Sequence, residues 1–291
     1  MPELPDLAIL ADALDVALSG RSLTGSKIAQ TLILRGTPAE LAAFEGQTLL
    51  DTSRRGKFLI FRFERDRMIF NPMLTGRLGL ATAGAKAWPQ WAAMFEFGPA
   101  ARAAKARRGR WPPANADWLP RRDLGVELRY RDATRMGKIY LMPAGVTRPV
   151  AGWDEQGPDA DDPALTVDVW RERIGRHSGE LKSLLRNQAF VAGIGNAYSD
   201  EILWAARLAP FRKRASLAGD EVDALYAATR ETLAWAIGEL RGLVPPRLEV
   251  EQRDFLRVHR KGGSACPRCG TRLSQVSAGG SDTTFCRGCQ R

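Results

Sequence analysis

The stretch from residue 266 to residue 289 reads CPRCGTRLSQVSAGGSDTTFCRGC and holds all four cysteines of the 291-residue chain. Cys266 and Cys269 form one C-x2-C pair, Cys286 and Cys289 form a second, and sixteen residues separate the two pairs. This spacing is typical of a zinc ribbon, in which each pair forms a tight turn and the residues between them form a β-hairpin. Because four thiolates complete a tetrahedral zinc site and leave no position for water, we predict one structural zinc ion.

The charge of the chain gives a second, weaker indication. Lys and Arg number 43 against 33 Asp and Glu, so the formal net charge is +10. Such an excess suits a nucleic-acid-binding protein, but a merely soluble basic protein shows it equally well. The same two interpretations, phosphate contacts or solubilising charges, apply to the basic residues near the cysteines: Arg257, Arg260, Lys261, Arg268, Arg272, Arg287 and Arg291.

The sequence gives no sign of a membrane span or a secretion signal. No apolar run approaches ~18 residues, and the N-terminus lacks a basic segment followed by an apolar one. We therefore predict a cytoplasmic protein with no membrane partner.

Periodic patterns divide the rest of the chain into two parts. A helix is expected from Pro5 to Leu18, and strands are expected at 58–63, 68–70, 126–130 and 138–142. We interpret the Ala-, Arg- and Pro-rich residues 99–122 as an exposed basic insertion. Residues 152–163 are rich in Gly, Pro and Asp and indicate a linker, and apolar residues from about 165 to 243 recur at helical spacing.

Within the helical part, residues 184–204 predict the end of one helix, a Gly193-Ile194-Gly195-Asn196 turn and the start of another helix. We expect Asn196 to be the N-cap of the second helix. Glycines in such a turn let a phosphate approach the backbone amides, but a plain corner between two helices contains the same glycines. The turn alone leaves both interpretations open.

Three separated segments together resemble one protein family. They are Met1-Pro2-Glu3-Leu4-Pro5, the turn Gly193-Ile194-Gly195-Asn196-Ala197-Tyr198, and the C-terminal cysteine pairs. In this order, and over nearly the whole chain, they resemble the formamidopyrimidine-DNA glycosylase and endonuclease VIII (Fpg/Nei) family. Arg54-Arg55-Gly56-Lys57 before an expected strand is a fourth match.

The resemblance implies an α+β multidomain fold. Residues 1–150 would form a catalytic domain with an N-terminal helix and a β-sandwich, and residues 151–163 a linker. Residues 164–245 would form a helix-two-turn-helix DNA-binding domain, and residues 255–291 the zinc ribbon. The expected protein is a monomer that binds damaged double-stranded DNA.

The resemblance also assigns catalytic roles. After removal of Met1, the Pro2 amine would attack C1′ of the damaged nucleotide, and the resulting Schiff base would allow the 3′ phosphate to be eliminated. Glu3 corresponds to the family's general acid and base, and Lys57 to a basic group near the reacting sugar. The implied activity is that of a bifunctional DNA glycosylase and AP lyase in base excision repair, acting on a damaged, oxidised base.

Further residues carry over as contacts to DNA. Lys182, Asn196 and Arg135 match phosphate-binding or base-reading positions, and Leu74 and Met136 fall where the family inserts side chains into the duplex. For Leu74 and Met136 a place in the core is the alternative. Glu201 matches a family acid near the active site, and a structural role is the alternative there.

Three departures from the family pattern concern DNA recognition. Asn71 stands where a histidine is common, and Thr134 replaces the first of two arginines. Ser281 occupies the hairpin position where the family carries a phosphate-binding arginine. The hairpin would therefore hold the lesion strand more weakly. Either Arg272 or Arg287 would reach this position, or the protein would depend on its other contacts and turn over oxidised bases slowly, and we favour the second. The lesion preference stays unassigned.

Two other functions compete with the enzyme. A catalytically weakened damage-binding protein on the same scaffold would explain the departures. A zinc-ribbon adaptor without base chemistry would explain the C-terminus but not the Met1-Pro2-Glu3 start.

Overall fold

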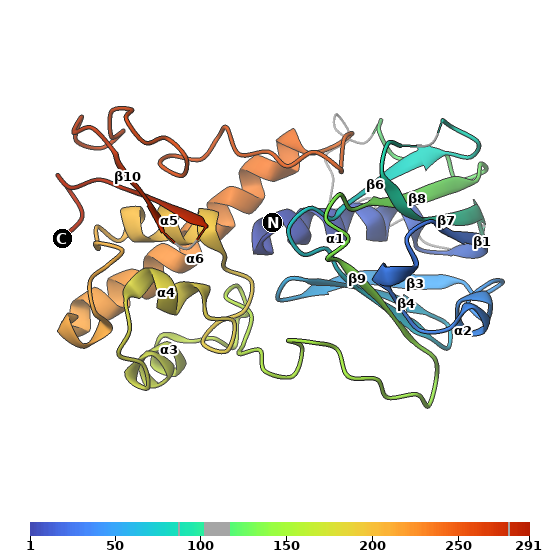
Figure 1. The fold of residues 1–291 in the computed structure, drawn as a ribbon, viewed down its shortest axis with the longest axis horizontal. Helices are drawn as coiled ribbons and strands as arrows, with labels where there is room; N and C mark the ends of the chain where they lie inside the picture. Colours follow the sequence, from blue (N-terminus) through green and yellow to red (C-terminus); the bar gives the residue numbers. More distant parts are fainter. Residues whose placement is uncertain (87, 102–116, 279) are drawn as a thin grey trace. The chain divides into compact units, whose positions relative to one another are not determined.

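The computed structural model describes residues 1–86, 88–101, 117–278 and 280–291, and the chain folds into two compact units (Figure 1). We call them the sandwich unit, made of Met1–Pro2, Asp6–Ala151 and Leu240–Gln252, and the helical unit, made of Glu3–Pro5, Gly152–Glu239 and Arg253–Arg291. The ranges expected for the linker and the ribbon, 151–163 and 255–291, stay predictions. Most of the expected basic insertion, residues 102–116, lies outside the described residues.

Two sheets and helix α1 (Leu4–Leu18) make up most of the sandwich unit. The first sheet has the order β1-β7-β8-β6, with strands Arg21–Ile28, Trp91–Ala100, Val126–Arg131 and Arg77–Thr82. The second has the order β2-β9-β5-β4-β3, with strands Leu34–Arg35, Lys138–Met142, Arg67–Asn71, Phe58–Phe63 and Leu49–Arg55. Only the short β2–β9 pair is parallel among the pairs of these two sheets. The short helix α2 (Pro38–Ala42) precedes β3.

Aromatic side chains fill the space between the two sheets. The ring of Phe63 on β4 stacks on that of Phe97 on β7, with centroids 6.4 Å apart. Phe70 on β5 meets Phe95 on β7 edge to face, with centroids 5.8 Å apart. Each such pair contributes about 1 kcal/mol beyond the apolar area that it buries, so these contacts help to fix the two sheets face to face.

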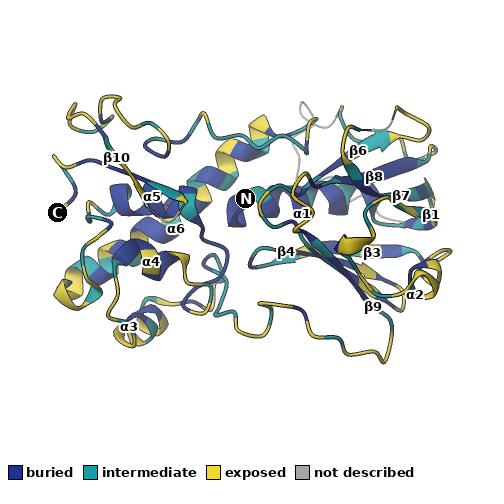
Figure 2. Cartoon of the chain, viewed as in Figure 1, coloured by how far each residue is buried: buried dark blue, intermediate teal, exposed yellow. Residues whose placement is uncertain are grey.

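The helical unit contains helices α3 (Val167–Gly175), α4 (Leu181–Arg186) and α5 (Asn196–Ala205) and most of α6 (Gly219–Leu243). Helix α5 is buried along most of its length, whereas α3 exposes much of its surface (Figure 2). The core centres on Trp170, whose ring centroid lies 4.8 Å from that of Phe190 and 5.8 Å from that of Tyr226.

A two-stranded hairpin follows in the same unit, formed by β10 (Ser274–Ala278) and β11 (Ser281–Phe285). Trp204, Val258 and Leu273 form a small apolar cluster with Cys266 and Cys286. The α+β fold expected from the sequence is confirmed, with an N-terminal helix, a β-sandwich, helices and a hairpin between the cysteine pairs. None of the helices within the described ranges is both long enough and apolar enough to cross a membrane.

Candidate active site

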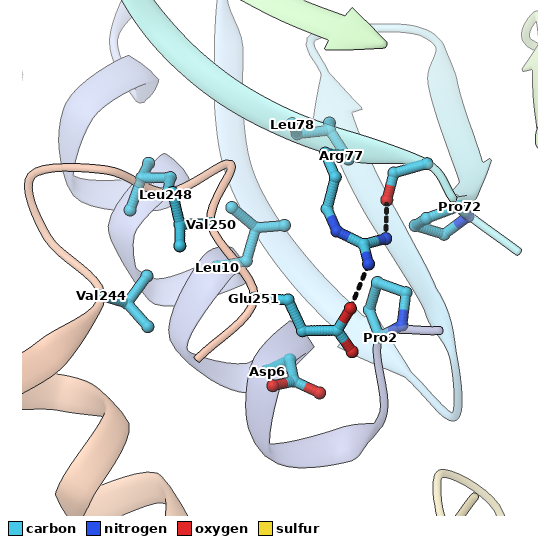
Figure 3. Close-up of a pocket in the computed structure, with 11 residues that line it drawn as sticks. Pro2, Asp6, Leu10, Pro72, Arg77, Leu78, Val244, Leu248, Val250 and Glu251 are labelled. Carbon is cyan, nitrogen blue, oxygen red and sulfur yellow. Dashed lines mark hydrogen bonds and ion pairs between the residues drawn. The ribbon is translucent and has the colours of Figure 1, made fainter. Parts of the chain in front are cut away.

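Pro2 is buried and lines a pocket of the sandwich unit (Figure 3). One wall is apolar and is made by Leu10, Leu78, Val244, Leu248 and Val250. Polar groups gather on the side of Pro2, where Asp6, Arg77 and Glu251 also line the pocket. A proline at the chain start is thus sheltered from bulk water in a small, partly polar cavity.

Arg77 and Glu251 form an ion pair beside Pro2. The Arg77 guanidinium donates to a carboxylate oxygen of Glu251 and, at 2.8 Å, to the carbonyl of Gly76 (Figure 3). The other Glu251 oxygen lies 3.6 Å from the amino terminus of Met1. The N-terminal end of the chain therefore faces a carboxylate, which favours a cation at that place.

Glu3, the next residue, belongs to the helical unit and caps helix α5. Its carboxylate accepts hydrogen bonds from the backbone amides of Gly195 (2.6 Å), Ala197 (2.8 Å) and Tyr198 (3.3 Å). Our expectation that Asn196 caps this helix is wrong, because Gly195 is the N-cap and has no side chain to satisfy these amides. A carboxylate 192 positions away replaces the local cap and also suits the positive end of the helix dipole.

The glycines of the turn admit the N-terminal segment of the chain. A Cβ atom on Gly195 would lie 2.5 Å from the Glu3 carboxyl carbon, and one on Gly193 would lie 2.7 Å from two side-chain carbons of Leu4. Gly193 also has φ +101°, a conformation that other residues rarely adopt. Both glycines are therefore explained by close packing against Glu3 and Leu4.

Asn196 and Lys182 contact the zinc hairpin. The Asn196 amide donates to the carbonyl of Asp282 at 2.9 Å. Lys182 is buried, and its ammonium donates to Asp200 Oδ1 (2.6 Å), the Asp282 carbonyl (2.9 Å) and Thr283 Oγ1 (2.9 Å). Burial lowers the pKa of Lys182, and the neighbouring Asp200 carboxylate opposes this shift. An ammonium has three hydrogens, so the phosphate contact expected of Lys182, which stays a prediction, would have to share one of them.

Glu201 has a structural environment. Its two carboxylate oxygens accept hydrogen bonds from the backbone amides of Arg257, Val258 and His259 at 3.0, 2.7 and 2.8 Å. These bonds hold the segment that leads into the first cysteine pair. The contacts support the structural alternative for Glu201.

Leu74 and Met136 lie on the surface of the sandwich unit, with exposed fractions of 47% and 43%. Neither side chain is part of the core, so the core alternative is wrong for both. Leu74 follows β5, and Met136 lies in the turn between β8 and β9 next to the exposed Arg135. Arg135 has φ +57°, the left-handed conformation that a tight turn requires here.

A buried carboxylate links the two loops that carry Leu74 and Met136. Asp132 Oδ2 accepts from the amide of Gly137 at 2.7 Å, and its Oδ1 accepts from the Thr75 hydroxyl. The hydroxyls of Thr75 and Thr134 are 2.7 Å apart. Lys138 adds hydrogen bonds to the carbonyls of Met136 (2.9 Å) and Gly137 (3.1 Å). These hydrogen bonds connect the two loops that carry the exposed side chains of Leu74 and Met136.

Lys57 lies in the turn between β3 and β4, is partly buried and does not line the Pro2 pocket. Sequence reasoning missed Arg77 and Glu251. Glu251 lies in a segment without periodic pattern, so only the fold brings it to Pro2.

Two of the basic residues near the cysteines stack on tryptophan rings. The guanidinium carbon of Arg268 lies 4.0 Å from the centroid of the Trp204 ring, and that of Arg257 lies 3.9 Å from the centroid of the Trp235 ring. These two guanidiniums therefore stabilise the ribbon's surroundings as cation–π partners.

The four cysteines converge as a metal site. All their sulfur atoms lie within 4.8 Å of one another, with Cys266 and Cys289 sulfurs 3.8 Å apart and Cys269 and Cys286 sulfurs 3.4 Å apart. Sulfurs bound to one tetrahedral zinc are separated by ~3.8 Å, so the donor set fits zinc. The predicted structural zinc site is confirmed, and the ion would cross-link the two turns without a catalytic role.

Family models match three parts of the chain. Residues 1–139 match the formamidopyrimidine-DNA glycosylase N-terminal domain, and residues 156–243 match the H2TH domain of the same enzymes. Residues 263–291 match the zinc finger found in FPG and IleRS. The order of these matches agrees with the three segments of the sequence resemblance.

Whole-chain relatives lead to the same family. The chain is 32% identical to the formamidopyrimidine-DNA glycosylase of Symbiobacterium thermophilum, over 100% of this chain and 89% of the relative. It is 30% identical to that of Geobacillus kaustophilus, with 100% of both chains covered. Among solved structures, Fpg of Lactococcus lactis in complex with DNA containing N7-benzyl-Fapy-dG has a TM-score of 0.82 at 25% identity, again with 100% of both chains covered. The chain belongs to the Fpg/Nei family of DNA glycosylases.

Proposed function

We propose that this protein is a bifunctional DNA glycosylase and AP lyase of base excision repair that acts on damaged, oxidised bases in double-stranded DNA. The observation that carries the proposal is the burial of Pro2 in a small pocket beside the Arg77–Glu251 pair. Family membership adds support, since the named relatives are DNA glycosylases.

In the proposed reaction, loss of Met1 exposes the secondary amine of Pro2. The amine attacks C1′ and loses its proton, the glycosidic bond breaks, and the base leaves with the bonding electron pair and takes up a proton. The nitrogen lone pair then opens the sugar ring: the C1′–O4′ bond breaks, O4′ takes up a proton, and an iminium forms between Pro2 and C1′. The iminium acidifies C2′, so loss of a proton there expels the 3′ phosphate. Glu3 and Lys57 are the proposed proton-transfer and electrostatic groups of this sequence.

Damaged DNA is the proposed partner. Leu74 and Met136 are exposed apolar side chains on supported loops, as insertion into a duplex requires. Arg135, Lys182 and Asn196 are the proposed polar DNA contacts. The monomeric state and the cytoplasmic location stay predictions.

Borohydride trapping tests this function. Mature protein is incubated with a duplex containing an abasic site and, separately, with duplexes containing single oxidised bases, and the reduced adduct is mapped by peptide mass spectrometry. We expect the adduct on Pro2, and we expect Pro2→Gly to slow excision. Pro38→Ala, on the exposed first turn of α2, is the matched control and should behave as the unsubstituted protein.

The outcomes separate the competing functions. Undiminished trapping of Pro2→Gly with the adduct on a lysine would contradict the Pro2 assignment. Tight binding of damaged duplex without any adduct would instead support the catalytically weakened damage-binding protein.

A further inference from the structure

Ser281 stands where the family resemblance expects a phosphate-binding arginine, and the structure places another arginine against it. The Ser281 hydroxyl donates to Asn196 Oδ1 at 2.7 Å and accepts from Arg186 Nη1 at 3.2 Å. Ser281 begins β11, Arg186 ends α4 and Asn196 begins α5, so three elements of the helical unit meet there. We call these three residues the Arg186 cluster.

The charge of Arg186 is not neutralised by a carboxylate. Arg186 is exposed, and no acidic side chain within the described parts of the chain forms an ion pair with it. Arg171, Arg176 and Arg212 of the same unit each pair with Asp or Glu. Since a guanidinium has five donor hydrogens and the bond to Ser281 uses one, most of its hydrogen-bonding capacity faces solvent.

The surroundings of Arg186 also suit an anion. Asn196 uses one amide hydrogen on the Asp282 carbonyl and keeps a second. Lys182 lies one turn earlier on α4 and adds a buried positive charge that Asp200 balances. Asp282 follows Ser281 in the sequence, and its negative charge is unfavourable for binding a phosphate. Its carboxylate accepts a hydrogen bond from the Ser277 hydroxyl across the hairpin at 2.5 Å. Donors from a guanidinium and an amide therefore converge on one small surface, and the Ser281 hydroxyl, whose hydrogen is donated to Asn196 Oδ1, joins them.

We propose that Arg186 supplies, from helix α4, the phosphate contact that the family takes from the zinc hairpin. The ligand is a backbone phosphate of damaged DNA, which the Arg186 guanidinium holds. Ser281 and Asn196 orient the guanidinium. The inference rests on the proposed function, and it replaces the expectation that the missing hairpin arginine leaves this contact weak. It also explains why Arg272 and Arg287 are not needed: Arg287 lies over the ring of Phe285, 5.9 Å from its centroid.

The proposal predicts the outcome of moving the arginine. Arg186→Met removes the cation, and Ser281→Arg in that background restores one from the hairpin side. In the unsubstituted protein, Ser281→Arg would place two guanidiniums next to each other, so it should gain little. Arg176→Met is the matched control, because it removes one exposed arginine at the C-terminus of α3, which pairs with Glu172.

The experiment measures the dissociation constant for a duplex with a tetrahydrofuran abasic-site analogue at several salt concentrations. Zinc content and thermal midpoint are checked for every variant. We expect Arg186→Met to weaken binding about tenfold, the size of a charge-assisted hydrogen bond. The slope of log K against log salt should fall by about 0.9, as for one lost phosphate contact. A role in folding alone would leave that slope unchanged.

Two further variants sharpen the result. Arg186→Lys keeps the charge but not the fork of donors, so an intermediate loss with an unchanged slope is expected. The double variant Arg186→Met with Ser281→Arg should regain both affinity and slope. Equal affinities of Arg186→Met and Arg176→Met would overturn the proposal for Arg186. The proposed function would still stand in that case, provided that the unsubstituted protein binds damaged DNA specifically. A loss that Ser281→Arg does not restore would also overturn the proposal for Arg186, and absence of damage-specific binding in the unsubstituted protein would overturn both.

Discussion

Two roles are assigned to the Glu3 carboxylate, one in capping a helix and one in the proposed chemistry. It accepts three backbone hydrogen bonds at the start of α5, and the proposed chemistry also requires it to exchange a proton near the sugar. These three hydrogen bonds fix the Glu3 side chain against the start of α5, and Pro2 is the residue that precedes it in the chain.

Substituting Glu3 with Gln should separate the two roles. A carboxamide offers one acceptor oxygen and turns an NH2 group toward backbone N–H donors, so we expect the free energy of unfolding to fall by about 1–2 kcal/mol. Urea unfolding measures this change. Glu172→Gln, on the exposed face of α3, is the control and should change it by less than about 0.5 kcal/mol.

Excision by the Glu3→Gln protein should also fall well below that of the unsubstituted protein at a temperature where both are folded. An unchanged free energy of unfolding would contradict the capping role. Normal excision would contradict the catalytic one.

How far the sequence reveals single residues depends on the distance to their partners. The cysteines were predictable, because two short spacings define a zinc site without knowledge of the fold. Arg186 was not, since its partner Ser281 is 95 positions away and the Arg186 position carries no motif. For the same reason Glu3 was recognised only by resemblance, and its capping of α5 is visible only in the structure.

At the level of elements, the loops after β5 and β8 are connected by hydroxyl groups. Thr134, which replaces an arginine of the family pattern, contacts Thr75 at 2.7 Å and donates to Asp132 at 3.2 Å. An arginine at residue 134 would lack this hydroxyl, whereas the threonine uses it to connect the two loops. Strands β4, β5, β8 and β9 were predictable from their apolar runs, but this bridge between strand ends was not.

Substituting Thr134 with Val should loosen the loops while preserving the shape of the side chain. Loss of the hydroxyl removes about 1 kcal/mol of hydrogen bonding, so the proposed insertion of Leu74 and Met136 into the duplex should become several-fold less favourable. 2-Aminopurine placed opposite the abasic site reports the insertion by its fluorescence. We expect a smaller fluorescence change at saturating protein, with the thermal midpoint shifted by only a few degrees.

Thr134→Ser is the matched control, because it keeps the hydroxyl and should restore the fluorescence change. If Val and Ser variants give the same signal as the unsubstituted protein, the hydroxyl bridge does not position the loops.

At the scale of the whole molecule, each unit has its own core. The sandwich unit is filled by the aromatic residues between its sheets, and the helical unit by the cluster around Trp170. The ribbon has only a small apolar cluster, in which the Trp204 indole donates to the Cys266 sulfur at 3.3 Å. The helical character of residues 165–243 and the four-cysteine ribbon could be predicted from periodicity and spacing. The assignment of Leu240–Gln252 to the sandwich unit could not, because no local pattern marks it.

Removal of zinc should therefore disrupt the structure of the ribbon alone but weaken the binding of DNA. The purified protein should contain one zinc ion per chain, held by Cys266, Cys269, Cys286 and Cys289. Because the ribbon's own cluster is small, chelation should release β10 and β11, and with them Ser281 and the hairpin contacts of Lys182 and Asn196. Hydrogen exchange should show loss of protection in β10 and β11 and retained protection in β4, β5, β7 and β8, while affinity for abasic-site DNA falls at least tenfold.

Cys266→Ser should reproduce the effect of the chelator. Added zinc should reverse the effect of the chelator but not that of the substitution. A metal content near zero in protein purified without chelator would contradict the zinc site, and simultaneous loss of protection in the sandwich strands would contradict the independence of the two cores.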